Sequence, residues 1–530
     1  MLGKTSPSIT GKVKGCRHNL DLAASWLRQC QSHHKECHGD NSGIYPTRLL
    51  RLVSKETETK LVLVEPAHTL GPYITLSHCW GSKEQHPLKT TQENYGRHIN
   101  GINYSELPKS FQDAVLVTGS LGVEYLWIDS LCIIQDSTED WQWECSRMSG
   151  VYSNSLLTIA AADAANSIAG FLSDYSPPPY PPVEFPAFVV EYPIPGQEAI
   201  GFSWETTLSG RAWAMQERLL SPRVLSFRRD RLVWECNHYT CSDDQHYPIA
   251  VNRMEFGEPE KRLMGNLDGL EFLEYWYDVI MTYSQCKLTQ ASDKLPALSG
   301  LANKASEKFK KPYLAGIWQE DIQVGLSWYN SCNCGKSSSS SSPPQAEEDV
   351  IVNRPSWSWA KSACSFHFRT EIRSQSWDMR LVGAKVTLAG TDRFGEVKAG
   401  TLSVSARLRI GFIGVFPKEH QNEHCLFDSQ TDRVERAHLA CDCEQASRFH
   451  SMSLDDRIEV SALLIAYDPT AFTKWIALAL EPATDSGSRA LYRRVGLLLC
   501  HSDFDKTSRE YKAAGSNWFD ECEMETVDIV

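Results

Sequence analysis

The chain has 530 residues, of which 42% are hydrophobic and 22% are charged. This length predicts roughly three to four domains, and the composition excludes a disordered, collagen-like or coiled-coil chain. The formal net charge of −13 argues against nucleic acid and anionic membranes as partners, because both bind basic surfaces. Sixteen tryptophans predict either a large aromatic core or many aromatic-lined surfaces.

The pattern of apolar residues and cysteines predicts the compartment. Residues 1–15 carry lysines without the apolar stretch of a secretory signal, and no segment approaches the ~18 apolar residues of a membrane-spanning helix. Seventeen cysteines are scattered along the chain, an odd number that is typical of reduced thiols. We therefore expect a cytoplasmic protein without a membrane segment.

Changes in composition divide the chain into five segments. A serine run followed by two prolines marks the main linker, because such a segment buries too little apolar surface to fold. The predicted segments are an N-terminal helical and polar segment (1–70), an α/β domain (71–235), a helical extension (236–330), a Ser/Pro-rich disordered linker (331–350) and a β-rich C-terminal module (351–530).

Strand and helix patterns alternate between residues 73 and 161. Apolar runs predict strands at 73–77, 125–129 and 156–161, and helical spacing predicts helices that begin at Pro108 and Glu139. Two successive strand–helix–strand crossovers predict a parallel sheet with right-handed connections. The expected fold class is α/β: a small parallel sheet flanked by helices, with a helical elaboration and a β-rich C-terminal module.

Polar residues follow the carboxyl ends of these strands, where open parallel sheets bind their ligands. Ser77, Asp129 and Asp163 are therefore expected at one edge of the sheet. Trp80 follows the first strand, and its indole is available to stack on a ring. For Asp129, capping of the following turn is an equally good interpretation, and one residue can do both.

Two further residues are candidates for the same site, each with a structural alternative. Glu144 lies at the border of the buried helix face, where partial burial would raise its pKa and suit it to acid/base work. The alternative is an ion pair with Arg147, one turn further on. Arg211 opens a short helix and is suited to bind a phosphate or carboxylate. Its alternative role is an ion pair with Glu217 that docks this helix.

The spacing of cysteines, histidines and glycines indicates whether the chain has a metal site or a phosphate loop. Cys30 and Cys37 lie close to His33, His34 and His38, but this spacing matches no standard zinc signature, and Cys-x2-Cys is absent from the sequence. No Gly-rich phosphate loop is present. We therefore expect no metal and no bound cofactor, and neither an ordinary ATPase nor a Rossmann dehydrogenase.

Five ordered blocks resemble the fungal heterokaryon-incompatibility (HET) domain: 73–81, 107–114, 121–136, 148–161 and 210–225. The resemblance implies a role in non-self recognition between fungal strains and in the cell death that follows. This family has a proposed distant similarity to Toll/interleukin-receptor (TIR) domains, some of which cleave NAD with a helix-borne glutamate. For that role the resemblance points to Glu144.

These observations leave two functions open. The first is an effector that hydrolyses the N-glycosidic bond of NAD or a related nucleotide, with Glu144 as catalytic residue and Ser77, Trp80, Asp129 and Arg211 as substrate-binding residues. The second is a non-enzymatic module that signals by binding partners or by self-assembly. In both cases a protein partner or self-association is expected to activate it.

Overall fold

The structure is a computed structural model, and its described residues form two compact units. The first comprises Met1–Asp268, Cys286–Leu288 and Pro296–Ala305, and the second comprises Gly269–Gln285, Thr289–Leu295 and Ser306–Val530. The predicted linker 331–350 lies outside the described residues. Those residues are 20–38, 45–55, 58–66, 71–172, 206–229, 231–243, 249–250, 267–330, 353–416, 423–428, 434–468, 470–471, 473–483, 491–501, 504–505, 510–511 and 518–530.

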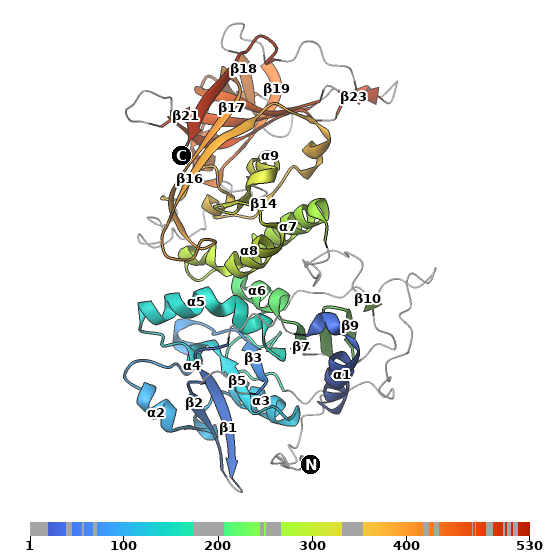
Figure 1. The fold of residues 1–530 in the computed structure, drawn as a ribbon. Coiled ribbons are helices and arrows are strands. Elements are labelled where there is room, and N and C mark those ends of the chain that lie inside the picture. Colours follow the sequence, from blue (N-terminus) through green and yellow to red (C-terminus); the bar gives the residue numbers. More distant parts are fainter. Residues whose placement is uncertain are drawn as a thin grey trace. The chain divides into compact units, whose positions relative to one another are not determined.

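The first unit alternates helices and strands around one sheet (Figure 1). Its elements are α1 (Leu20–His33), β1 (Leu49–Lys55), β2 (Glu58–Val64), β3 (Tyr73–Ser77), α2 (Tyr95–Asn100), β4 (Ile102–Asn103), α3 (Lys109–Ser120), β5 (Tyr125–Ile128), α4 (Asp129–Cys132), α5 (Thr138–Ser153), β6 (Leu157–Ala160), α6 (Ala212–Leu220), β7 (Arg223–Phe227), β8 (Leu232–Cys236), β9 (Tyr239–Ser242), β10 (Ile249–Ala250) and the first part of α8 (Pro296–Phe309).

The sheet of this unit has ten strands in the order β10-β9-β8-β7-β6-β3-β5-β1-β2-β4. Its centre is parallel: β3 pairs with β5 and with β6, and β6 pairs with β7. This confirms the predicted α/β class and its parallel strands. Antiparallel strands extend the parallel centre on both sides, so the sheet is larger than the sequence indicated.

The two crossovers place helices on opposite faces of the parallel strands. The chain runs from β3 through α3 to β5 and then returns through α5 to β6 on the other side of β3. Because such crossovers are right-handed, α3 and α5 cover opposite faces, as Figure 1 shows. All residues of β3, β5 and β6 are buried, as expected for strands covered on both sides.

Aromatic side chains pack α5 against this sheet. The hydroxyl of Tyr73 donates to the carbonyl of Val151 at 2.6 Å, and the rings of Trp127 and Tyr152 meet edge to face at 5.6 Å. Seven tryptophans in the described part of the chain are fully buried, including Trp127 and Trp234. Most of the tryptophan content therefore builds cores, and Trp143 is the most exposed described exception.

The second unit is mostly β-structure, which confirms the predicted β-rich C-terminal region. Its elements are α7 (Gly269–Tyr283), the end of α8, β11 (Tyr313–Leu314), β12 (Ile317–Trp318), α9 (Ile322–Leu326), β13 (Tyr329–Asn330), β14 (Phe366–His367), β15 (Ser376–Trp377), β16 (Arg380–Leu388), β17 (Val397–Phe416), β18 (Glu423–Asp428), β19 (Val434–Cys441), α11 (Cys443–His450), β20 (Arg457–Tyr467), β21 (Thr473–Pro482), β22 (Leu491–His501), β23 (Phe504–Asp505), β24 (Glu510–Tyr511) and β25 (Met524–Ile529).

The main sheet of this unit has nine strands, and β17 pairs with β20 so that the strand pairings close into a ring. An apolar cluster that includes Leu464, Ala477, Leu498 and Phe519 forms its core. Among the helices that the structure describes in either unit, none combines the length and the apolarity that crossing a bilayer requires.

Candidate functional site

Several predicted site residues meet at the carboxyl ends of β3 and β5. Ser77 ends β3, Asp129 follows β5, and Arg211 immediately precedes α6. A guanidinium nitrogen of Arg211 donates a hydrogen bond to the carbonyl of His78. The parallel topology thus brings Ser77, Trp80, Asp129 and Arg211 to one edge of the sheet.

Asp129 is held by groups of the protein itself. Its Oδ2 accepts a hydrogen bond from Trp80 Nε1 at 2.8 Å, and its Oδ1 accepts one from the backbone N–H of Ser130 at 2.7 Å. His78 Nδ1 lies 3.9 Å from the same carboxylate. Burial lowers the pKa of His78 to about 4, so this imidazole is neutral at pH 7. The Asp129 carboxylate therefore binds the N–H of the next residue and orients Trp80.

The deepest acidic group at this edge is Glu217, which the sequence analysis considered only as an ion-pair partner. Its carboxylate accepts a hydrogen bond from the Ser77 hydroxyl. Burial raises the pKa of Glu217 to about 7, although nearby Arg211 and the hydrogen bonds of Ser77 and Tyr152 favour the charged form. A carboxyl group in this range can both take up and release a proton near neutral pH.

A small cleft with a volume of about 50 Å³, partly open to solvent, lies beside this pair. Ser77 of β3, Ala160 of β6 and Ser226 of β7 line it at the carboxyl ends of the parallel strands. Arg218 and Arg228 line it as well. Ser77 is the one predicted site residue among the lining residues, so this cleft supports only part of the predicted site.

One positive charge of the cleft is paired within the protein. Arg218 makes two hydrogen bonds to the Glu235 carboxylate, at 2.8 and 2.7 Å, so its charge is largely neutralised. The backbone N–H of Arg229, next to Arg228, donates to Asp163 Oδ2 at 2.8 Å. This places Asp163 at the end of the hairpin formed by β7 and β8.

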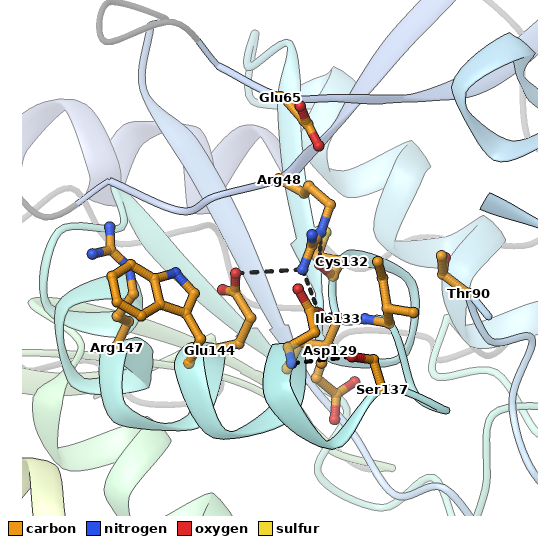
Figure 2. A network of polar contacts seen from close by, with 12 residues as sticks. Arg48, Glu65, Thr90, Asp129, Cys132, Ile133, Ser137, Glu144 and Arg147 are labelled. Atoms are coloured by element: carbon orange, nitrogen blue, oxygen red, sulfur yellow. Dashed lines mark hydrogen bonds and ion pairs between the residues drawn. The ribbon is translucent and has the colours of Figure 1, made fainter. Parts of the chain in front are cut away.

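Glu144 belongs to a network of polar contacts around α5. Arg48 reaches it from the residue that precedes β1, with Nη2 at 2.5 Å from Asp140 Oδ2 and at 3.4 Å from Glu144 Oε1 (Figure 2). The Glu144 side chain is only 1% exposed, and its Oε2 has no hydrogen-bond partner among the described residues. Burial raises its pKa, while the Thr47 hydroxyl and Arg48 oppose this effect.

The partner that the sequence suggested for Glu144 points elsewhere. Arg147 donates to the carbonyl of Tyr45 at 2.9 Å, and its guanidinium lies 5.1 Å from the ring centre of Trp143. Glu144 is therefore ion-paired, as in the structural alternative, but with Arg48. The structure does not bring Glu144 into the group formed by Ser77, Arg211 and Glu217.

Residues suited to metal binding gather elsewhere in this unit. Cys30, His34, Cys37 and Cys236 place one ligand atom each within 4.8 Å of one another. The spacing of the first three residues matched no zinc signature and predicted no metal. The fourth could not be found by spacing, because Cys236 lies 202 residues after His34.

Comparison with known proteins identifies one region. Residues 73–217 match the family described as heterokaryon incompatibility protein (HET). The chain therefore carries a HET domain, which confirms the resemblance seen in the sequence. The matched region begins at β3 and ends at Glu217, so it contains Ser77, Trp80, Asp129, Glu144 and Arg211. No curated protein and no solved structure matches the chain.

Proposed function

We propose that this chain, which carries a HET domain, is a fungal incompatibility effector that hydrolyses the N-glycosidic bond of NAD or a related nucleotide. The observation that carries this proposal is the pair of Ser77 and Glu217 beside a cleft at the carboxyl ends of parallel strands. Cell death would follow from loss of the nucleotide. A protein partner or self-association would activate the effector.

The chemistry of the bond suits this pair. In hydrolysis the C1′–N bond breaks, and the nitrogen heterocycle (nicotinamide in the case of NAD) leaves with the bonding electrons. Positive charge then develops on the ribose ring. A water oxygen forms the new C1′–O bond, and its proton must pass to a base. The Ser77 hydroxyl would accept that proton while donating its own to Glu217. Arg228 would contact the diphosphate, since guanidinium groups bind such anions bidentately.

Glu144 fits this role less well than Glu217. A catalytic carboxylate must reach the substrate, whereas the Glu144 side chain is 1% exposed and faces Arg48. Glu217 is also buried, at 5% exposure, but it hydrogen-bonds to a residue that lines the cleft. A catalytic role for Glu144 stays a prediction from the sequence, and the same experiment tests it.

The test is NAD turnover by the purified full-length chain, with product release followed by chromatography. Glu217→Gln and Ser77→Ala are expected to lower kcat by at least about 100-fold, the usual contribution of a general base. Asp113→Asn is the matched control, because it alters a buried carboxylate of α3 that does not line the cleft. This control should retain its turnover per folded molecule.

Three outcomes contradict parts of the proposal. Absence of turnover by the oligomerised wild-type chain, with NAD and with related nucleotides, removes the hydrolase. Unchanged turnover in Glu217→Gln removes the role of the Ser77–Glu217 pair. Loss of turnover in a stably folded Glu144→Gln variant would instead support the prediction made from the sequence.

A second function, a non-enzymatic interaction module, is favoured by two exposed tryptophans of α5. The side chains of Trp141 and Trp143 on this helix are 37% and 57% exposed. Large exposed aromatics are unusual on monomer surfaces and frequent in protein interfaces. In this case the HET domain would signal by binding a partner through α5.

Cell-death assays in a fungal host distinguish the two functions. The double variant Trp141→Ser/Trp143→Ser should abolish killing if binding carries the signal, while Glu217→Gln should leave killing intact. The matched control is Trp377→Ser, which removes a tryptophan that is 37% exposed in the second unit. The enzymatic proposal predicts the opposite pattern for the first two variants.

A further inference from the structure

Three cysteines and a histidine from distant parts of the sequence converge in the first unit. Cys30 lies in the last turn of α1, and the backbone N–H of His34 donates to its carbonyl at 3.0 Å, so both residues lie on one face of a helical turn. The 3-10 helix η1 (Lys35–Cys37) then brings Cys37 back toward them. Cys236 is the last residue of β8.

The geometry of the four side chains matches a tetrahedral site. Their ligand atoms all lie within 4.8 Å of one another, and Cys236 Sγ is 3.7 Å from His34 Nδ1. Zinc bonds of about 2.3 Å to sulfur and 2.0–2.1 Å to nitrogen, at tetrahedral angles, place such S and N ligands about 3.6 Å apart. The three cysteines are buried, and none of them forms a disulfide.

We propose that Cys30, His34, Cys37 and Cys236 bind one Zn²⁺ ion in a structural site. Three thiolates and an imidazole are the soft ligand set that selects zinc among the divalent ions of the cell. All four coordination positions would be filled by protein groups, which is the pattern of structural rather than catalytic zinc.

Neighbouring groups support the charge and orientation of these ligands. A zinc ion with three thiolates carries one net negative charge, and the buried guanidinium of Arg223 donates from Nε to Cys30 Sγ at 3.1 Å. The backbone N–H of Tyr239 bonds to the sulfur of Cys236. The ring of His34 stacks on His238 with 4.5 Å between ring centres, which fixes its orientation. Such contacts to the ligand side chains orient them and strengthen metal binding.

The site would link two segments that are far apart in the sequence. It attaches α1, which precedes the HET domain, to β8, which follows it. Glu235, adjacent to Cys236, lines the cleft and pairs with Arg218. A zinc ion here would therefore fix the strand that forms one wall of the cleft. This role is independent of the proposed hydrolase, because it needs no substrate.

Metal analysis of the purified full-length chain tests the proposal. Mass spectrometry of the metal content should find about one zinc per chain. Reconstitution with Co²⁺ should give a thiolate-to-cobalt charge-transfer band and the intense d–d bands of a tetrahedral ion. Cys236→Ser should lose the stoichiometric zinc and lower the Tm. Cys241→Ser, which removes a buried cysteine of β9 outside the cluster, is the matched control and should keep the zinc.

A second variant keeps the test decisive if Cys236→Ser fails to fold. His34→Cys would convert the ligand set into four thiolates and should retain zinc with a shifted cobalt spectrum. Wild-type protein that contains no zinc and takes up none after reduction overturns the proposal. So does a disulfide between any two of the three cysteines in freshly purified protein, detected by alkylation. Failure of NAD hydrolysis would leave the zinc result unchanged.

Discussion

Glu217 and His78 titrate in opposite senses at the same edge of the sheet. Burial raises the pKa of Glu217 from its ordinary 4.5 to about 7 and lowers the pKa of His78 from 6.5 to about 4. Both shifts favour the neutral forms, because each charge loses hydration inside the protein. At pH 7 this edge therefore carries a neutral imidazole next to a carboxyl group that is close to half-protonated.

These shifts predict how stability depends on pH. The unfolded chain releases the Glu217 proton near pH 4.5, whereas the folded chain holds it to about pH 7. This group's contribution is therefore complete below pH 4.5 and is lost as the pH rises through 7, a change of roughly 3 kcal/mol. The contribution of His78 to stability has the opposite pH dependence: it is present above pH 6.5 and is lost as the pH falls from 6.5 toward 4.

Glu217→Gln should therefore become more stable relative to the wild type as the pH rises from 5 to 8. The variant lacks the group that releases a proton, while His78 still titrates in both proteins. Thermal unfolding across this range measures the difference. Glu124→Gln, at an exposed ion pair with Arg51, should show no such trend. A constant difference between Glu217→Gln and the wild type from pH 5 to 8 would contradict the raised pKa.

Helix α5 carries both a buried ion pair and exposed aromatic side chains. Asp140 and Glu144 lie against Arg48, and the partly exposed Trp141 and Trp143 lie on either side of this pair around the helix. Arg48 also donates from Nε to the carbonyl of Cys132 at 2.6 Å, so one guanidinium joins α5 to the end of α4. The ion pair thus positions a helix of the HET domain from a residue outside the matched region.

Arg48→Met tests this interpretation of Glu144. Removing the cation leaves Glu144 buried without its charge partner, which typically costs about 3–5 kcal/mol of unfolding free energy. Adding Glu144→Gln should restore part of that loss, because it removes the uncompensated charge. A double-mutant cycle from denaturant unfolding measures the coupling. If Glu144→Gln alone changes turnover but not stability, Glu144 is catalytic rather than structural.

The elements of the HET domain could be predicted from sequence because their signals are local. The predicted strand 73–77 and the predicted helix beginning at Glu139 differ from β3 and α5 by one residue or less at their starts. Parallel pairing followed from the two crossovers. The added antiparallel strands β1 and β2 could not be placed, because the alternation of their residues does not say which neighbour they pair with.

The contacts that define the sites were less predictable, since they join residues far apart in the chain. Ser77 and Glu217 are 140 residues apart, and Arg48 and Glu144 are 96 residues apart. Local spacing predicted Arg147 as the partner of Glu144, because it lies one turn away on the same helix. In the folded chain the charge partner of Glu144 is Arg48 instead. For the same reason the cysteine-rich segment 30–37 gave no zinc signature without Cys236.

At the scale of the whole molecule, the unit that contains the HET domain is completed by residues beyond it. The segments Cys286–Leu288 and Pro296–Ala305 belong to the first unit although they follow the start of the second. The backbone N–H of Gly300 on α8 donates to Gln216 Oε1 of α6 at 2.8 Å. Arg211 pairs with Lys287 through a parallel bridge, so the start of α6 is also held from this side.

Gly300→Ala measures how much the HET domain depends on this later helix. In an isolated helix alanine is more favourable than glycine by about 1 kcal/mol. In this structure a Cβ at Gly300 would lie 2.5 Å from the Ser149 Cβ of α5 and 2.9 Å from Gln216 Oε1. The variant should therefore be destabilised, by about 1–3 kcal/mol as for overpacked cores, and should lose turnover because Gln216 adjoins Glu217.

The matched control for this change is Gly269→Ala at the start of α7, where an added Cβ has no atom within 4 Å. It should leave the Tm unchanged or raise it slightly. Thermal unfolding of the two variants beside the wild type decides between helix propensity and close packing as the dominant effect. A gain of stability in Gly300→Ala would mean that α8 moves away from α5 and α6 without cost. In that case the later helix would not be needed to complete the first unit.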